Sequence, residues 1–280
     1  IKPQSRFDSK IASAQVKSCM LFAALGTDRA LSYSEPVLSR PHTENLLSYF
    51  GHTVQDRDGQ IFFSPSEDSL RSFPETFTAP GDPSSACFFL ALALLHGASN
   101  LRINSVLDAP GRNGFANLLA RKNVLAESPK ADWLFESVRD FSLKAGAQWT
   151  GVEIDEADVP SLIDEIPMVG FMAPFASAKT VVRNAEELRV KESDRIEATL
   201  KGLNKMGATT KEFKDGFEVL GEGSLRGGCE VESYHDHRIA MAAAVAATRC
   251  ELPVTICDSD CVAISFPQFF EFFERLGLKI

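Results

Sequence analysis

Long apolar stretches are missing from this sequence. A membrane-spanning helix needs roughly 18 to 20 uninterrupted apolar residues, whereas the nearest candidate, Ala86 to Ala98, is shorter and stops at a glycine. The first residues, IKPQSRFDSK, lack an initiator methionine and the positively charged segment that precedes the apolar part of a secretory signal peptide. We therefore expect no membrane segment and a chain that begins inside a longer protein.

The sequence has no cysteine framework. Its six cysteines are scattered, and Cys19 and Cys87 fall inside apolar helical patterns, where a thiol behaves as a small hydrophobic group. Cys257 and Cys261 approach the spacing of a metal-binding pair, but no second pair follows at zinc-site spacing. These features favour a reducing, cytoplasmic location and disfavour a metal site.

Basic residues are outnumbered by acidic ones. The formal net charge of −9 argues against nucleic acid or an anionic membrane surface as the main partner. It does not exclude small anionic substrates, because a few arginines that converge in a cleft determine the local potential there.

Helical periodicity with recognisable end signals recurs along the chain. The first predicted helix has apolar residues at i, i+3, i+4 and i+7 from Val16, with Ser13 as its N-cap and Gly26 as its end. Three further predicted helices are RPHTENLLSYFG at 40–51, SSACFFLALALLHG at 84–97 with Ser84 or Ser85 as cap, and SFPQFFEFFERLG at 265–277.

Two segments share a longer pattern. Gly51 and Gly207 each end a predicted helix and are followed by a strand, an Asp-Gly turn and a second strand, with the turn glycines at Gly59 and Gly216. This favours an internally repeated unit. A linker-like passage at 72–85 contains three prolines and a glycine. We predict an α/β protein with a small, truncated first lobe at 1–80 and a larger second lobe at 81–280.

Arginine occurs twice where a helix should disfavour it. ELRVKESDR leads into a helix that begins near Ser193 or Asp194, so Arg195 lies in the first turn. DHRIAM places Arg238 in the first turn of another helix, capped by Asp236. A cation at the positive end of a helix dipole is mildly unfavourable. Either both arginines and both helix N-termini bind one anion, or both arginines are exposed and offset by neighbouring acids.

Candidate acids and bases lie nearby in the sequence. Asp164 and Glu165 interrupt an apolar run, LIDEIP, where burial would raise a carboxyl pKa and tune it for proton transfer. Helix capping before Pro167 explains them equally well. Glu192 is a further candidate, whose alternative is a solvated surface carboxylate. Neither His235 nor His237 belongs to a larger ligand cluster, so we expect no metal there.

Taken in order, seven motifs resemble the 5-enolpyruvylshikimate-3-phosphate synthase family: ASAQVKS, SRPHTE, GDPSSA, LIDEIP, ELRVKESDR, DHRIAM and SFPQF. The resemblance covers nearly the whole chain. It implies a two-lobe enolpyruvyl transferase fold built from repeated βαβαββ units. It also implies the shikimate-pathway reaction of aromatic amino-acid biosynthesis, in which the enolpyruvyl group of phosphoenolpyruvate moves to the 5-hydroxyl of shikimate 3-phosphate and phosphate is released.

The resemblance also implies roles for individual residues. Ser13, Ala14 and Gln15 would contact shikimate 3-phosphate, with Gln15 also reaching phosphoenolpyruvate. Arg40 would bind the shikimate phosphate, and Arg195 and Arg238 would clamp phosphoenolpyruvate. Asp164 and Glu192 would be the acid and base, and Lys191 would orient substrate and stabilise charge. The family needs no metal or organic cofactor.

Departures from the family pattern leave alternatives open. The family's upstream segment, with several basic ligands, does not precede these motifs, and Ile264 stands where some members have a lysine. We expect a cytoplasmic protein that is monomeric when full length and a 280-residue chain with little activity alone. The alternatives are a fragment or silent relative that only binds an anionic ligand or a partner and, less favoured by the motifs, a UDP-N-acetylglucosamine enolpyruvyl transferase.

Overall fold

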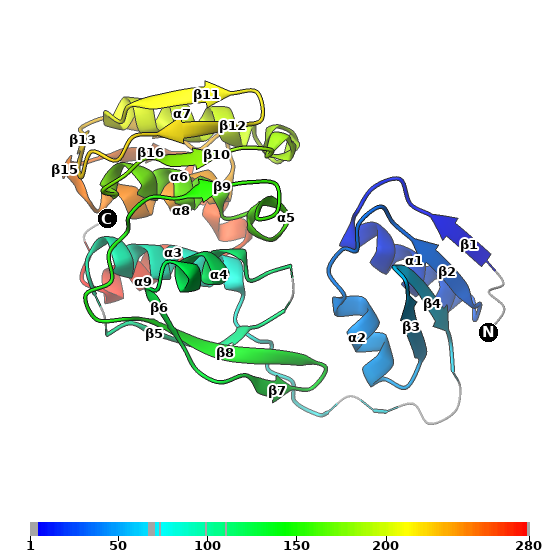
Figure 1. The fold of residues 1–280 in the computed structure, drawn as a ribbon. Helices are drawn as coiled ribbons and strands as arrows, with labels where there is room; N and C mark the ends of the chain where they lie inside the picture. Colours follow the sequence, from blue (N-terminus) through cyan, green and yellow to red (C-terminus); the bar gives the residue numbers. More distant parts are fainter. Residues whose placement is uncertain (1–4, 67–70, 73, 99, 110, 279–280) are drawn as a thin grey trace. The chain divides into compact units, whose positions relative to one another are not determined.

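A computed structural model describes residues 5–66, 71–72, 74–98, 100–109 and 111–278 of the chain (Figure 1). The chain divides into two compact units. The first comprises Ile1–Pro80, Leu107–Gly111 and Lys130–Arg139, and the second comprises Gly81–Val106, Arg112–Pro129 and Asp140–Ile280. The first unit thus contains the residues of the predicted first lobe and two short segments from further along the chain.

The first unit contains one βαβαββ unit. Its four strands form a sheet in the order β1-β2-β4-β3, in which β1 pairs parallel to β2 and the remaining pairs are antiparallel. A small core, which includes Leu21, Tyr33 and Phe63, lies between the sheet and its helices. The elements are β1 (Ser5–Asp8), α1 (Ala14–Gly26), β2 (Leu31–Ser34), α2 (His42–Tyr49), β3 (Thr53–Arg57) and β4 (Gln60–Ser64).

The same topology returns in the second unit. Four strands form a sheet in the order β11-β12-β10-β9, in which β9 pairs parallel to β10 and β12 pairs antiparallel to both β10 and β11. The predicted repeat is therefore confirmed. The elements are β9 (Glu153–Ile154), α5 (Val159–Leu162), α6 (Ile166–Met172), β10 (Thr180–Val182), α7 (Arg195–Met206), β11 (Thr210–Phe213) and β12 (Gly216–Val219), with 3₁₀ helices at Ala173–Phe175 and Glu186–Val190.

A third copy of the pattern lies between these two in the sequence. Gly81 forms an isolated parallel bridge with Val106 of β5. Strand β5 belongs to a sheet of order β5-β8-β6, and β7 joins this sheet by pairing with β8. The α/β class and the repeated βαβαββ organisation are thus as predicted. The elements are α3 (Pro83–Leu95), β5 (Arg102–Leu107), α4 (Gly114–Arg121), β6 (Leu125–Glu127), β7 (Ala131–Trp133) and β8 (Glu136–Leu143).

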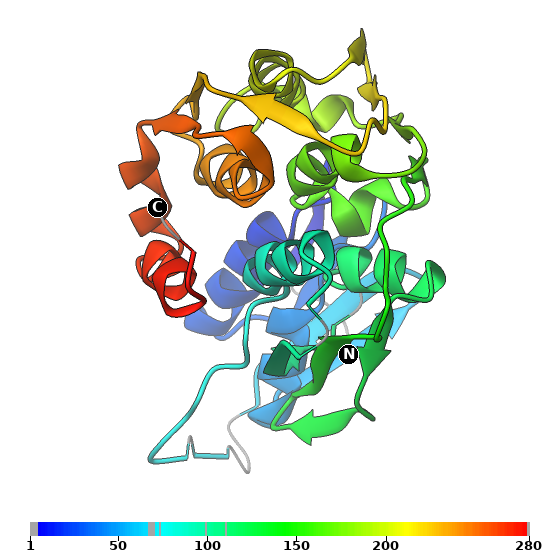
Figure 2. The same cartoon turned by 90° about the vertical axis from the view of Figure 1, so that its left-hand side faces the viewer.

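The last part of the chain completes the helical core of the second unit. Figure 2 shows α3, α6 and α8 nearly end-on and side by side. Most residues of these three helices are buried. None of the helices among the described residues is long and apolar enough to cross a membrane. The elements are β13 (Leu225–Gly227), β14 (Glu230–Glu232), α8 (His237–Ala247), β15 (Cys250–Leu252), β16 (Thr255–Cys257), the 3₁₀ helix Ser259–Ile264, and α9 (Phe269–Arg275).

The start of α3 differs from the prediction. Asp82, and neither Ser84 nor Ser85, is the N-cap: its carboxylate accepts hydrogen bonds from the backbone N–H groups of both serines, at 3.3 and 3.0 Å. Pro83 occupies the first helical position, where its lack of an N–H costs nothing. One carboxylate can accept from two N–H groups, which makes Asp82 the better cap.

The second hairpin also differs in detail. Asp58 and Gly59, with φ of 53° and 82°, form the predicted turn between β3 and β4. Between β11 and β12 the turn residues are Lys214 and Asp215, and Gly216 begins β12 opposite Phe213. A Cβ on Gly216 would lie 2.0 Å from the carbonyl oxygen of Val182 on β10. This glycine therefore permits a close approach of two strands.

Candidate active site

The N-termini of α7 and α8 form one group of predicted site residues, and this group lies wholly in the second unit. Asp194 caps α7 by accepting from the N–H of Glu197 at 3.0 Å, and Asp236 caps α8 by accepting from the N–H of Arg238 at 2.9 Å. Both predicted helix starts are confirmed. Arg195 and Arg238 occupy the first turns of these helices, as the sequence indicated.

Arg195 is almost completely buried, with a side chain only 1% exposed. Its Nε donates to Asp236 Oδ2 at 2.9 Å, and the same guanidinium donates through Nη2 to Glu192 Oε2 at 2.6 Å. Its Nη1 donates to Asp164 Oδ1 at 3.3 Å. The alternative of an exposed arginine is therefore wrong, although the neighbouring acids that it assumed are present. These carboxylates offset the unfavourable position of the cation in the helix dipole.

Arg238 points toward the turn before α6. Its Nη1 donates to the backbone carbonyl of Asp164 at 3.0 Å and lies 3.6 Å from Glu165 Oε1, while Nη2 lies 3.7 Å from Asp164 Oδ2. The side chain is 14% exposed. Arg195 and Arg238 thus meet at one carboxylate, that of Asp164.

A third arginine, Arg112, belongs to the same group and was missed from the sequence. Its Nη2 donates to Asp82 Oδ1 at 2.5 Å, and its Nη1 lies 3.8 Å from Asp164 Oδ2. Arg112 comes just before α4, in a loop without periodicity, and the sequence offered no signal that could have found it.

Asp164 is held in its ionised form. Burial raises the pKa of this carboxyl, but the charges of Arg238, Arg195, Lys191 and Arg112 outweigh burial and lower the pKa below its ordinary value. The expectation that burial would raise the pKa of Asp164 is therefore wrong, because four cations from distant parts of the chain surround it.

Glu165 behaves in the opposite way. It is 5% exposed, and burial raises the pKa of its carboxyl to about 7, although Arg238 and a hydrogen bond with Ser84 act to lower it. Ser84 Oγ donates to Glu165 Oε1 at 2.5 Å. Glu165 occupies the N-cap position of α6 but makes no capping hydrogen bond with its side chain. Two adjacent carboxyls thus have pKa values shifted in opposite directions.

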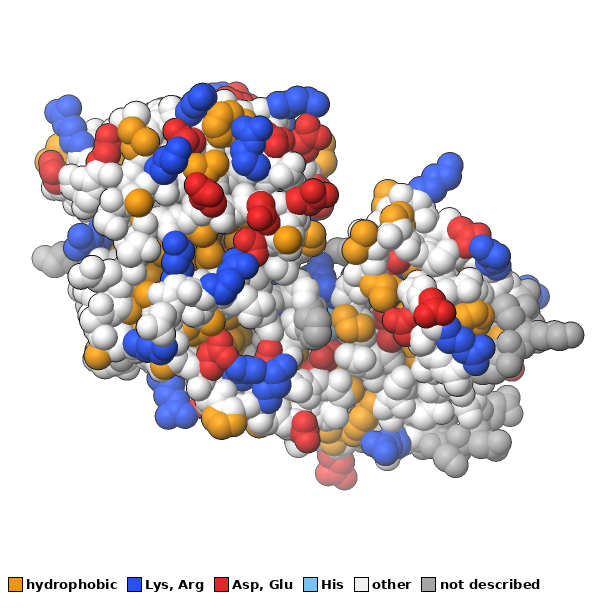
Figure 3. Space-filling view, in the orientation of Figure 1, with side chains coloured by type: hydrophobic (Ala, Val, Ile, Leu, Met, Phe, Trp, Pro, Cys, Tyr) orange, Lys and Arg blue, Asp and Glu red, His pale blue; other side chains and the backbone are white. Residues whose placement is uncertain are grey.

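Lys191 and Glu192 lie in the loop between the 3₁₀ helix Glu186–Val190 and α7. Lys191 Nζ forms an ion pair with Glu187, and its side chain is 24% exposed. The Glu192 side chain is 54% exposed, the most open of the three carboxylates on Arg195. Figure 3 shows acidic and basic side chains interspersed over the face of the second unit that it presents.

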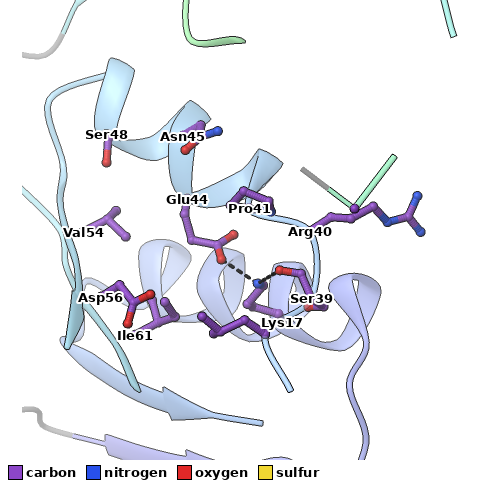
Figure 4. Close-up of a pocket in the computed structure, with 12 residues that line it drawn as sticks. Lys17, Ser39, Arg40, Pro41, Glu44, Asn45, Ser48, Val54, Asp56 and Ile61 are labelled. Carbon is purple, nitrogen blue, oxygen red and sulfur yellow. Dashed lines mark hydrogen bonds and ion pairs between the residues drawn. The ribbon is translucent and has the colours of Figure 1, made fainter. Parts of the chain in front are cut away.

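The remaining predicted site residues belong to the first unit. Ser13 caps α1, its Oγ accepting from the N–H of Val16 at 3.4 Å and donating to Gln15 Oε1 at 3.3 Å, and Ala14 is the first helical residue. Arg40 lies just before α2 and lines a cavity of about 450 Å³ (Figure 4). Ser13, Ala14 and Gln15 are brought together at one helix end.

Metal ligands do not gather in the part of the chain that the structure describes: it contains no group of three or more His, Cys, Asp or Glu side chains arranged to hold an ion. All six cysteines, each within that part, are free thiols. Ile264 ends the 3₁₀ helix Ser259–Ile264 with 82% of its surface exposed.

The fold built from these repeated units is shared with enolpyruvyl transferases of known structure. The EPSP synthase of Acinetobacter baumannii superposes with a TM-score of 0.89 and 35% identity over 98% of this chain and 62% of that one. The enolpyruvyl transferase NikO of Streptomyces tendae, with a TM-score of 0.69 and 17% identity, shares the fold.

Sequence comparison narrows the class. The model of the EPSP synthase (3-phosphoshikimate 1-carboxyvinyltransferase) family matches residues 3–273, and the chain belongs to this family. The 3-phosphoshikimate 1-carboxyvinyltransferase of Petrotoga mobilis is 39% identical over 279 residues, and that of Thermodesulfovibrio yellowstonii is 40% identical over 271. These matches take in 96% of this chain but 62% of each relative.

Proposed function

We propose that the protein transfers the enolpyruvyl group of phosphoenolpyruvate to the 5-hydroxyl of shikimate 3-phosphate and releases phosphate. The observation that carries the proposal is the convergence of Arg112, Arg195 and Arg238 on Asp164. Such a group combines cations for an anionic substrate with a carboxylate that stays ionised.

Two proton transfers are needed in this reaction. One proton leaves the attacking hydroxyl, and another reaches the methylene carbon of phosphoenolpyruvate, so two positioned groups must act. We assign Asp164 as the base that accepts the hydroxyl proton, because the surrounding cations keep its carboxylate ionised, which is the form that can accept a proton. We assign Glu192 to the second transfer.

Every guanidinium in the site already has a carboxylate partner, so an incoming anion would share or replace one. Glu192 is the partner most open to solvent, whereas Asp236 is fully buried. An anion that replaces Glu192 on Nη2 of Arg195 would keep the arginine paired and would release the Glu192 carboxylate toward the substrate. Binding and the availability of the second acid/base group would then be linked.

The remaining assignments follow the family. Arg195 and Arg238 bind phosphoenolpyruvate, and Lys191 stabilises the charge that develops at the reacting carbon. Ser13, Ala14, Gln15 and Arg40 bind shikimate 3-phosphate. We also propose a cytoplasmic location, which the free thiols support, and a monomer when full length.

Phosphate release tests the function. The 280-residue chain and a chimaera that adds the part of the Petrotoga mobilis relative left uncovered by the match would each be assayed with both substrates. Release that requires both substrates supports the proposal, and we expect it from the chimaera. Binding of both substrates without release by the chimaera would favour the binding-only alternative. If the chimaera neither binds the substrates nor releases phosphate while the intact relative is active in parallel, the proposal is contradicted.

A further inference from the structure

A buried charged cluster connects α1, α2 and the loop before α2 in the first unit. Lys17 Nζ lies 3.2 Å from Glu35 Oε1 and 2.6 Å from Glu44 Oε1, and the side chains are 1%, 0% and 8% exposed. Lys17 Nζ also donates to the carbonyl oxygen of Ser39 at 2.9 Å (Figure 4). Lys17 thus links two buried carboxylates to the backbone of the loop, while Glu44 Oε2 has no hydrogen-bond partner among the described residues.

The carboxylate of Glu35 binds two segments of chain at once. Its Oε1 accepts from the backbone N–H of Ser39 at 2.7 Å and from Ser39 Oγ at 2.8 Å, and its Oε2 accepts from the backbone N–H of Ser13 at 3.2 Å. Ser13 begins the segment Ser13–Gln15, and Ser39 directly precedes Arg40. One buried carboxylate therefore fixes the spacing between the two predicted substrate-binding segments of this unit.

Stability alone does not account for this arrangement. Removing charges from water is costly, and apolar residues of similar volume are often as stable as a buried ion pair. The hydrogen bonds end on the backbone of two short segments that carry polar side chains, and Figure 4 shows the Arg40 side chain directed away from Lys17 and Glu44. The cluster is suited to holding the backbone of both segments in place.

We propose that Glu35, held by Lys17, is a positioning residue that sets the segments Ser13–Gln15 and Ser39–Arg40 for shikimate 3-phosphate. The inference rests on the proposed function, which assigns this ligand to these segments. Glu35 itself does not contact the substrate. It fixes the two segments before binding, so that less ordering remains to be done when the ligand arrives.

Glu35→Gln tests this role with almost no change in volume. The two oxygens of Glu35 accept from Ser39 and from Ser13 separately. A glutamine has one acceptor oxygen and one donor NH₂ group, so it can keep the hydrogen bond from one of these two N–H groups but loses the other. Two measurements on the 280-residue chain would be compared: backbone amide exchange by NMR, and the dissociation constant for shikimate 3-phosphate by calorimetry.

We expect at least one of the Ser13 and Ser39 amides to exchange faster in Glu35→Gln, and the dissociation constant to rise roughly 3- to 10-fold. We expect Glu35→Leu, which removes both acceptors, to accelerate both amides. Glu44→Gln is the control, since Glu44 contacts Lys17 but makes no hydrogen bond to the Ser13 or Ser39 amide among the described residues. Circular dichroism would verify that each variant is folded at the temperature used.

The outcomes separate the inference from the function on which it rests. If both amides keep their exchange rates in folded Glu35→Leu, or if they accelerate while the affinity for shikimate 3-phosphate stays at the original value, the positioning role is wrong. If the unaltered chain does not bind shikimate 3-phosphate, the ligand assignment fails, and the exchange rates alone then decide whether Glu35 holds the two segments.

Discussion

Arg195 and Asp236 form a buried ion pair that joins the N-terminus of α7 to that of α8. Arg195 Nε lies 2.9 Å from Asp236 Oδ2, and the two side chains are 1% and 0% exposed. Asp236 also accepts from the Arg238 N–H and from Ser193 Oγ, at 2.9 Å each. A single carboxylate therefore positions both arginines of the proposed phosphoenolpyruvate site.

Removal of the Asp236 carboxylate should destabilise the second unit. We expect Asp236→Ala to lower the free energy of unfolding of the second unit by roughly 3 to 5 kcal/mol, because it leaves a buried guanidinium without its main partner. Asp236→Asn should cost less, because asparagine is also a good N-cap. Urea unfolding would be followed by the fluorescence of buried Trp149 in a Trp133→Phe background. Equal stability of the alanine variant and the parent would refute the structural role of the pair.

Glu165 should make stability depend on pH. Its pKa is about 7 in the folded chain against an ordinary value of 4.5. As pH rises from 4.5 to 7, the unfolded chain loses this proton first, so the free energy of unfolding falls by up to about 3 kcal/mol and levels off above 7. Glu165→Gln should lack this loss.

Carbon-13 NMR titration of the Glu165 carboxyl measures the shift directly and should give a midpoint near pH 7. Ser84→Ala removes a hydrogen bond that lowers the pKa, so the midpoint should move higher in this control. A midpoint at the ordinary value in the parent chain would show that burial does not control this group.

Gly216 should not tolerate a side chain. A Cβ would lie 2.0 Å from the Val182 carbonyl oxygen, a backbone atom, so β10 and β12 would have to separate. We expect Gly216→Ala to lower the free energy of unfolding by more than about 2 kcal/mol, measured by urea unfolding with Trp149 fluorescence. The matched control is Gly223→Ala, where φ is +82° and nothing lies within 4 Å of the added carbon, so that only the backbone conformation costs about 1 to 2 kcal/mol. A smaller cost at Gly216 than at Gly223 would exclude the close approach.

The parts of the fold that depend on neighbouring residues could be read from the sequence. The starts of α7 and α8 were predicted because Asp194 and Asp236 cap them within one turn, and the repeat was visible because each copy ends in a helix and a hairpin. The start of α3 was misplaced because Asp82, Ser84 and Ser85, all residues that favour the N-cap position, lie within four positions, and only the geometry selects Asp82.

The parts of the site that depend on distant residues could not be read in this way. The burial of Arg195 requires Asp236, 41 positions away, and the low pKa of Asp164 requires four cations from three separate segments. Arg112 was missed because its partner Asp82 lies 30 positions away, and Glu35 because it joins nearby Ser39 to Ser13, 22 positions away. Sequence motifs thus identified most of the candidate residues, but neither Arg112 nor the opposite pKa shifts of Asp164 and Glu165.

Phosphate release by Asp164→Asn tests the central claim most directly. In the chimaera with the uncovered part of the Petrotoga mobilis relative, asparagine preserves the size of the side chain but cannot accept the hydroxyl proton. We predict that kcat for phosphate release from shikimate 3-phosphate and phosphoenolpyruvate falls by about 100-fold or more, with a much smaller change in KM. An unchanged kcat, or a rise in KM alone, would contradict the assignment of Asp164 as the base.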